Sequence, residues 1–495
     1  MAYVTSEVGH DGFGRKVIYT DVAEITESNV VEVLRKAYTV HLKNKIRMEY
    51  LYSYYKGNQP VLSRKKEVRP EICNRVVENR ANEIVSFKVG YLMGEPIQYV
   101  SRGDDKEVAE SVTRLNDYVS AEDKASKDKE LAEWWHICGT AYRMVLPDDA
   151  EEREEDEAPF EIYTLDPRYS FVIRFNGLGT PVVMGVKYVT MEDGTLIFSC
   201  YTSNHFYEID NTWGIRKSED QILGIPIIEY PMNTARLGAF EIVLPLLDAI
   251  NNVDSNRLDG VEQFIQALML FHNVDISSDD YTKLRQDGAI KFKDIDPQLK
   301  AEIKYLVEEM NQTQTQTLID HLYDTILTIC GMPNRNGGSS TSDTGSAVIM
   351  RDGWSAAEAR AKDSELIFKQ SEKEFLKLTL RICRDLASLN LKLSQVEIRF
   401  TRRNYENIQE KANVLTSMLN NNKIAPILAF THCGMFSDPQ IAYAMSRDYA
   451  EEQEAKTLAQ MEKLAGVHDD DDDDEGGGDK GNKKPKAKKE DGGEG

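Results

Sequence analysis

The sequence predicts an α+β fold that is mostly helical, in which long amphipathic helices flank a small β-containing unit. Three observations carry this prediction. Apolar residues recur every three or four positions over residues 242–268 and again over residues 303–329, which is the period of a helix with one buried face. Residues 269–295 interrupt this period between the two helices. Over residues 160–230 the apolar period changes to two, which is typical of strands.

The N-terminal part is predicted to form helices separated by turns. Residues 21–51 carry a helical apolar pattern, and the aromatic run YSYY that follows ends in the turn sequence KGNQP at residue 60. A second helical pattern begins at residue 72 and stops at Gly90, and Pro96 excludes further helix. Residues 105–145 again show helical spacing.

An acidic run separates these helices from the strands. Residues 151–157 hold six acids and one arginine, which indicates an exposed loop. Short β-rich runs then fill residues 160–230, divided by turn sequences such as Asn176-Gly177 and Asp193-Gly194. We therefore expect a compact β-rich region set into a helical chain.

The second half begins with a long helix from Ile242, followed by an alternating strand at residues 289–293. A second long helix is expected after Pro297, and Gly331-Met332-Pro333 supplies its stop signal. The run 334–345 is small and polar, which predicts a flexible loop. A third helix is expected over residues 346–389, with Gly353 as a site for a kink.

The C-terminal end changes from helix to low complexity. Residues 412–464 show helical spacing. From about residue 466 the chain holds six consecutive aspartates, Asp469 to Asp474, and then a lysine-rich stretch among glycines. Such a segment cannot bury enough apolar surface to fold, so residues 466–495 are predicted to be a disordered, charged tail.

No motif of catalysis or metal binding is found in the sequence. GxxxxGK[ST], GxSxG and HExxH are absent, so no catalytic residue and no cofactor is predicted. The six cysteines are far apart, which excludes a Cys/His metal cluster and indicates small buried hydrophobes. His136 stands beside Trp135 in an apolar helix and is expected to be a core histidine. No apolar run approaches the roughly 20 residues of a membrane helix.

The formal charge is 60 − 83 = −23. Tight DNA binders neutralise phosphates with Lys and Arg, so this charge argues against a sequence-specific DNA-binding protein. The negative charge is compatible with a conduit through which DNA slides, because strong attraction between the protein and the phosphates would slow the DNA. The alternative interpretation is that the acids only keep a large assembly soluble.

The motifs YSYYKGNQP (residues 52–60) and NRVVENRANEIVSFKVGYLMGEPIQY (residues 74–99) resemble the N-terminal signature of tailed-bacteriophage portal proteins, SPP1 Gp6-like. The order of helix, small β unit, helix, flexible loop and long helix also resembles that family, and Thr344-Gly345-Ser346-Ala347 is similar to its entry into the long helix, with Thr in place of the common Ser. The resemblance covers roughly residues 25–460.

The resemblance implies a portal fold with wing, stem, clip and crown. The implied boundaries are the following: wing 1–240, including the β-rich part 160–230; first stem helix 241–268; clip 269–296; second stem helix 297–331; tunnel loop 332–345; wing helix and return segment 346–411; crown 412–465; tail 466–495.

The resemblance further implies a dodecameric ring at one capsid vertex, present in the virion and in the host cytoplasm during assembly. Double-stranded DNA would pass through it without sequence recognition during packaging and ejection. The implied protein partners are the terminase large subunit, head-completion or adaptor proteins, and the major capsid and scaffold proteins. ATP hydrolysis would belong to the terminase.

Two sets of residues are predicted to line the channel. The tunnel loop would contribute Asn336, Ser339, Ser340, Thr341, Ser342, Asp343 and Thr344. The neutral run 311–317 in the second stem helix would contribute Gln312, Gln314 and Gln316, since neutral groups exert no long-range pull on phosphates. The alternative for this run is an ordinary solvent-exposed helix face.

Two other classes of function stay open at this point. One is a metal-dependent nuclease or other hydrolase, supported only by the many acidic residues. The other is a different capsid-associated structural protein, such as a scaffold or minor head protein, although a scaffold has no need of two long helices flanking a β unit.

Overall fold

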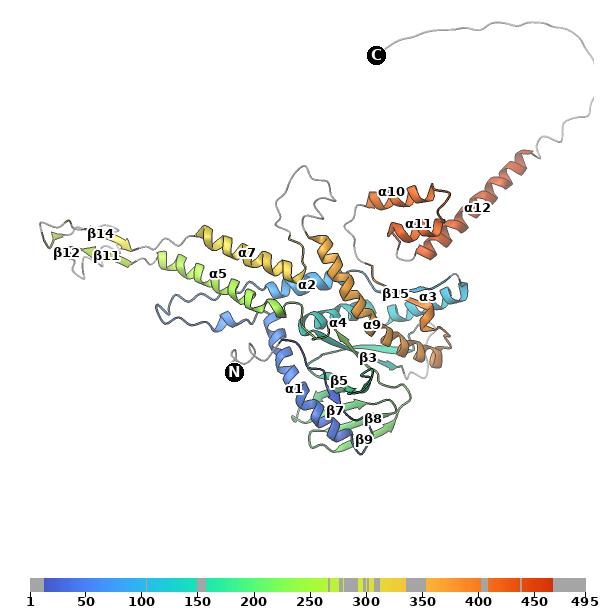
Figure 1. Ribbon diagram of the computed structural model, residues 1–495, viewed down its shortest axis with the longest axis horizontal. Helices are drawn as coiled ribbons and strands as arrows, with labels where there is room; N and C mark the ends of the chain where they lie inside the picture. The colour runs from blue at the N-terminus through green and yellow to red at the C-terminus, as the bar shows by residue number, and fades with distance from the viewer. Residues whose placement is uncertain are drawn as a thin grey trace, which may run out of the picture. The chain divides into compact units, whose positions relative to one another are not determined.

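The chain forms a mixed α+β structure in two compact units, residues 1–407 and residues 408–495 (Figure 1). About half of the residues that the structure describes lie in helices, and the strands form several small sheets. This computed structural model describes residues 13–103, 105–148, 157–265, 268–275, 279, 293–296, 300, 302–306, 312–334, 353–401, 408–436 and 439–465.

A six-stranded sheet packs against α1 (Val30–Tyr55). Its order is β1 (Tyr19–Thr20), β5 (Ser170–Phe175), β6 (Val182–Thr190), β7 (Leu196–Tyr201), β8 (His205–Asp210) and β9 (Ile215–Asp220). β1 pairs parallel with β5, and the other pairs are antiparallel. Alternate strand residues such as Phe171, Ile173 and Val186 are buried with Leu34 and Ala37 of α1. The β-rich region expected over residues 160–230 is therefore confirmed.

A three-stranded antiparallel sheet packs against the first. Its order is β10 (Ile227–Pro231), β3 (Thr140–Pro147) and β4 (Phe160–Leu165). Met144 and Ile227 are buried against Val172 of β5. Gly185 of β6 lies in this contact, and a Cβ at that position would stand 2.9 Å from the Cβ of Ile227. The absence of a side chain at Gly185 thus lets the two sheets approach.

Helices surround the smaller sheet and form the largest buried cluster. They are α2 (Arg80–Leu92), α3 (Lys106–Ala121), α4 (Lys124–Cys138) and α9 (Trp354–Ala387). Trp135 of α4, Leu115 of α3 and Phe375 of α9 are fully buried in this cluster. β2 (Gln98–Ser101) pairs antiparallel with β15 (Val396–Arg399), so the chain returns to the N-terminal region after α9.

Two helices, α5 (Leu244–Ile265) and α7 (Gln312–Cys330), run side by side, and short strands connect them (Figure 1). β11 (Leu268–His272) pairs antiparallel with β14 (Glu302–Leu306), and β12 (Val274–Asp275) pairs with β13 (Lys293–Asp294). Short 3₁₀ turns occur at Pro60–Ser63, Glu241–Val243 and Leu393–Gln395.

The second unit consists of helices in its described part. These are α10 (Ile408–Leu419), α11 (Pro426–Cys433) and α12 (Pro439–Ala465). α11 contacts both α10 and α12. Pro426 occupies the first turn of α11, where its fixed φ is tolerated, and Gly434 ends that helix in the left-handed region. The helical prediction for residues 412–464 is confirmed.

Three local predictions are wrong. The helix expected from residue 72 begins at Arg80, because residues 74–78 are extended and bond to α5. The helical stretch expected over residues 105–145 ends at Gly139, whose φ of +73° stops α4 before β3. The helix expected directly after Pro297 begins at Gln312, since residues 302–306 pair with β11 as β14.

The remaining local predictions are tested only in part, because several of them concern residues outside the described ranges. Gly353 has a φ of +81° and is the N-cap of α9, whereas residues 346–352 of the expected helix lie outside the described residues. The acidic run is described only at Glu157, the strand expected over residues 289–293 only at Lys293, and the tail 466–495 lies outside the described residues. His136 is buried, its Nδ1 is 2.7 Å from the Ala132 carbonyl oxygen, and burial lowers its pKa to about 3, as expected for a core histidine.

A buried charge network joins α9 to the rest of the first unit. Glu372 of α9 accepts hydrogen bonds from the hydroxyls of Tyr99 (2.6 Å) and Tyr230 (2.8 Å). Its carboxylate also pairs with Lys124 (2.7 Å) and Arg143 (3.5 Å). Burial alone raises the pKa of Glu372, but the two cations and the hydrogen bonds outweigh it and lower the pKa to about 2. The carboxylate therefore stays charged in the folded chain.

Replacing Glu372 by Gln should destabilise the protein by about 3–5 kcal/mol at pH 7, because it leaves buried cations without their partner. Because the folded pKa is depressed, the contribution of Glu372 is present above about pH 4 and is lost as pH falls toward 2. Denaturant unfolding at several pH values measures both effects. Glu374→Gln, which changes an exposed glutamate of the same helix, is the control and should cost less than about 0.5 kcal/mol. Equal losses in the two variants would contradict this account.

Candidate channel elements

The α5–α7 pair rests on an apolar contact that continues into the first unit. Leu247 and Ile250 of α5 are buried in one cluster with Ile319 and Ile326 of α7. Tyr54 of α1 belongs to the same cluster, and its hydroxyl donates to Asp248 of α5 at 2.9 Å. The two helices are thus fixed at the end that lies nearest the core.

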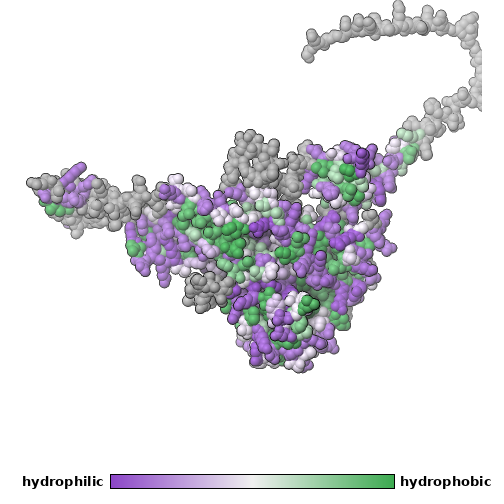
Figure 2. All heavy atoms as spheres, viewed as in Figure 1, coloured by the Kyte–Doolittle hydropathy of each residue, from purple (hydrophilic) through white to green (hydrophobic). Residues whose placement is uncertain are grey.

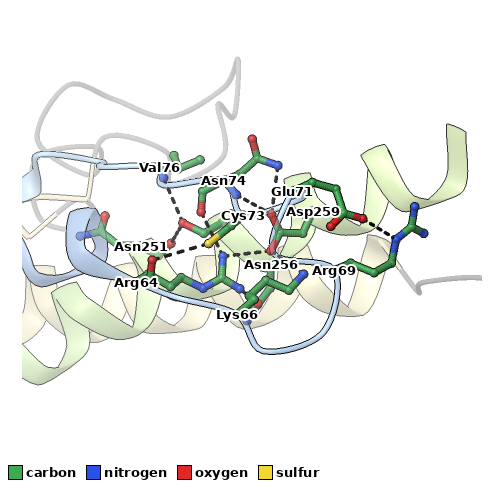
Figure 3. A network of polar contacts seen from close by, with 11 residues as sticks. Arg64, Lys66, Arg69, Glu71, Cys73, Asn74, Val76, Asn251, Asn256 and Asp259 are labelled. Atoms are coloured by element: carbon green, nitrogen blue, oxygen red, sulfur yellow. Dashed lines mark hydrogen bonds and ion pairs between the residues drawn. The ribbon is translucent and has the colours of Figure 1, made fainter. Parts of the chain in front are cut away.

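An extended segment, residues 74–78, docks along α5. The backbone N–H groups of Asn74, Val76 and Glu78 donate to side chains of α5. Figure 3 shows part of this contact. The pairs and their N···O distances are Asn74 to Asp259 (2.7 Å), Val76 to Ser255 (3.0 Å) and Glu78 to Asn251 (2.9 Å).

The spacing of these bonds matches two regular geometries. The three acceptors are four residues apart on α5, which is a rise of about 6 Å. The three donors are two residues apart in extended chain, which is about 6.6 Å. The segment and the helix therefore stay in register over two helical turns. A helix at residues 74–78 would use these N–H groups internally and lose the contact.

Asp259 is the most heavily bonded acceptor. Its buried carboxylate accepts from the Asn74 side chain at 3.0 Å and pairs with Arg64 and Lys66, each at 3.0 Å. Burial alone raises the pKa of Asp259, but the bonds from Asn74 and Lys66 and the charge of Arg64 lower it below its usual value. This anion therefore holds both the docked segment and the basic connector before it.

A second set of bonds ties the end of α1 to the same helix. Gln59 donates to Asn79 at 3.1 Å and accepts from Asn251 at 2.5 Å. Asn79 donates to the Tyr55 carbonyl oxygen at 2.8 Å. Gly57 supports this turn with a φ of +94°. Three segments distant in sequence thus meet at Asn251.

The C-terminal end of α7 is capped on two sides. The N–H of Met332 bonds to Leu327 O at 2.9 Å and that of Gly331 to Thr328 O at 3.2 Å, which is a Schellman motif around a glycine at φ +64°. The Lys88 ammonium donates to the Cys330 carbonyl oxygen at 2.7 Å, where a cation complements the helix dipole. The predicted stop at Gly331 is confirmed.

The sequence matches the family model described as phage portal protein, SPP1 Gp6-like, over residues 34–463. The chain belongs to this family. A comparison with curated proteins returns no match. Proteins of this family are structural components of the phage particle that form the portal for DNA at a capsid vertex, and they are not enzymes.

The geometry explains why the family signature has its residue types. Gln59 and Asn79 belong to the two motifs quoted from the sequence, and they bond to each other. Gln59 also bonds to Asn251 of α5, and Asn79 bonds to the end of α1. Together the two side chains of this portal protein link α5 to the end of α1. Sequence reasoning did not find the matching acceptors Asn251, Ser255 and Asp259, whose four-residue spacing on one helix face was the available signal.

Two of the three predicted stem residues have exposed side chains. Gln314 and Gln316 are exposed, whereas Gln312 begins α7. Gln316 accepts from Arg257 of α5 at 2.7 Å and donates to Asp320 at 2.8 Å. The predicted tunnel-loop residues Asn336, Ser339, Ser340, Thr341, Ser342, Asp343 and Thr344 lie outside the described residues.

The two helices carry few positive charges. α7 contains two aspartates and no Lys or Arg, and α5 contains four acids and one arginine. In the space-filling view, hydrophilic and hydrophobic residues alternate over α5 and α7 (Figure 2). Within the described residues, no helix is long and apolar enough to cross a membrane. The same part of the chain shows no group of three or more His, Cys, Asp or Glu placed to hold a metal.

Replacing Asp259 by Asn should release the docked segment, because it removes the charge that holds Arg64 and Lys66. We expect a loss of about 2–4 kcal/mol in stability. We also expect faster hydrogen exchange at the amides of residues 74, 76 and 78. Glu262→Gln, a change of charge on the same helix outside this network, is the control. Unchanged exchange in Asp259→Asn would show that the segment does not depend on this carboxylate.

Substitution of Asp254 is predicted to stabilise the protein, in contrast to substitution of Asp259. Burial, and then the charge of Glu78, raise the pKa of Asp254 to about 6. A raised pKa means that ionisation of this carboxyl destabilises the fold, with a cost that is absent below about pH 4 and complete above pH 6. Asp254→Asn should therefore stabilise the protein by up to about 1 kcal/mol at pH 8, after allowing for solvent screening, and not at pH 4. Thermal unfolding at the two pH values measures this difference, and an equal gain at both would contradict it.

Proposed function

We propose that the chain is one subunit of a dodecameric ring in which α5 and α7 form the stem of the DNA channel. The observation that carries this proposal is the pair of long helices that leave a buried core and end in a small β unit, in a chain of the portal family. Residues 1–240 and 346–411 would form the wing, and residues 412–465 the crown.

The strand pairing modifies the clip and stem boundaries expected from the sequence. β14 pairs with β11, so we place the clip at residues 268–306 rather than 269–296. The second stem helix then begins at Gln312, where α7 begins. Residues 332–345, which include the segment from Asn336 to Thr344, would be the tunnel loop that meets the passing duplex.

Exposed apolar side chains on the stem helices support a ring. Leu258 and Val261 of α5 are 42% and 43% exposed, and Leu318 of α7 is 46% exposed. In the monomer these side chains contact water over much of their surface. A neighbouring subunit placed by rotation would cover them, which is the heterologous contact that a closed ring repeats.

The mechanism of the channel is passive. The described stem helices hold six acids and one arginine, and Gln314 and Gln316 add neutral groups, so the lining attracts phosphates weakly. Force and ATP hydrolysis would come from the terminase large subunit docked on the clip. Head-completion or adaptor proteins would later occupy that surface, and the major capsid and scaffold proteins would contact the ring in the capsid vertex.

Negative-stain electron microscopy with native mass spectrometry tests the assembly. We expect rings with a central hole and about twelve copies. A protein that stays monomeric across salt and protein concentrations would contradict the ring. Incubation with DNA and Mg²⁺ or Mn²⁺ separates this function from a nuclease, since the channel protein should leave the DNA intact.

The double variant Gln314→Lys, Gln316→Lys should impede DNA packaging, because added ammonium groups in the lining would bind phosphates and slow the duplex. The measurement is the amount of nuclease-protected DNA per capsid, which we expect to fall several-fold, with the defect relieved by added salt. Gln314→Ser, Gln316→Ser is the matched control, because it removes the bond to Arg257 without adding charge. Normal packaging by the lysine variant in assembled rings would show that this face of α7 does not line the channel.

A further inference from the structure

A groove of about 1120 Å³ lies on the first unit, within the part of the chain that we propose to form the wing. It runs along the C-terminal half of α9, between β10 with its preceding segment and residues 391–393. Small-molecule sites usually occupy about 300–1,000 Å³, so this groove has the size for a longer ligand.

Cations dominate the rim of this groove. Lys377, Arg381, Arg384 and Lys392 line it. Within the described residues, Lys377 and Arg384 pair with exposed acids of their own helix, Glu374 at 2.7 Å and Asp385 at 3.1 Å. Such surface pairs are weak and are readily exchanged for another anion.

Two of the cations have no carboxylate partner in the described part of the chain. Arg381 donates to the Leu223 carbonyl oxygen at 3.2 Å, and the ammonium of Lys392 makes no ion pair there. The chain has a net charge of −23, so two cations in one groove without a carboxylate partner in the described residues are a local exception.

The basic surface continues along α9. Lys373 and Lys369 lie one and two turns before Lys377, and they line a second hollow of about 410 Å³ together with Arg102. Leu393 lines both hollows. Side chains four residues apart share one side of a helix, so these lysines and Arg381 form a single stripe.

The floor of the large groove is apolar. Leu223, Ile225 and Leu378 line it and are only partly buried. A ligand that satisfies both the floor and the rim must carry apolar side chains as well as negative charges. An extended peptide with acidic and apolar residues has both, whereas a DNA duplex offers phosphates to the rim and no apolar group to the floor.

We propose that this groove docks an extended acidic segment of a partner protein. The contact adds a docking surface on the wing to the surface assigned to the clip, and it does not depend on which helices line the channel. Opposite charge would speed the encounter, and the apolar floor would hold the bound segment.

Fluorescence anisotropy of the assembled full-length protein tests this site. The probe is a labelled synthetic peptide in which aspartate and leucine alternate, and the reference peptide has asparagine in place of each aspartate. We expect binding of the acidic peptide at least about tenfold tighter than of the reference, weakening as NaCl rises from about 0.05 M to about 0.5 M.

Arg381→Glu and Lys392→Glu should each weaken binding of the acidic peptide at least about fivefold. Lys43→Glu, an equal charge change at an exposed position of α1 that does not line the groove, should leave it unchanged. Unfolding curves that match the parent confirm that the variants fold. Equal binding of the two peptides, or parent-like binding by both groove variants, would overturn the proposal. Binding of a duplex oligonucleotide that requires Arg381 and Lys392, with no binding of the peptide, would assign the surface to nucleic acid and overturn it as well.

Discussion

The docking of residues 74–78 along α5 sets the register between the N-terminal part of the chain and the α5–α7 pair. Three backbone N–H groups of an extended segment meet three side-chain acceptors on successive turns of a helix. Each bond contributes only about 1 kcal/mol net, but leaving a buried donor unpaired would cost more. The contact therefore specifies the register between the N-terminal part and α5 more than it adds stability.

The placement of α7 and of strands β11 and β14 depends on the placement of α5. α5 packs against α7 through Leu247, Ile250 and Ile326. The paired strands β11 and β14 lie between the two helices in the sequence. At the other end of α7, Lys88 of α2 caps the helix at Cys330, so the N-terminal signature holds both helices of the pair. A single region of sequence thus fixes the geometry of the elements that we assign to the stem and clip.

The charge distribution agrees with a conduit for DNA. The basic stretch at residues 64–66, which lies beside α5, is used internally, because Arg64 and Lys66 pair with Asp259. The helices themselves carry mainly acidic and neutral groups. Negative charge, which looks unfavourable for a DNA-handling protein, suits one that lets the polymer slide.

Much of this arrangement could be predicted from the sequence, and the exceptions share a physical cause. The stop at Gly331, the β-rich region and the buried His136 follow from local chemistry, and all three are confirmed. Residues 72–79 show a helical apolar pattern but form no helix, because side chains of α5 about 180 positions away accept the backbone hydrogen bonds of residues 74, 76 and 78. Residues 302–306 likewise form a strand through pairing with residues 268–272, at least 30 positions earlier. The apolar period of a segment does not reveal tertiary bonding of this kind, because the partners lie far away in the sequence.

The most direct test of the central claim is a cryo-electron microscopy map of the assembled protein with duplex DNA in its channel. The account predicts that α5 and α7 surround the duplex, that residues 74–78 lie along the side of α5 that faces away from the DNA, and that no basic side chain of either helix contacts phosphates. A closed ring in which these two helices lie on the outer surface, with other elements around the DNA, would contradict it.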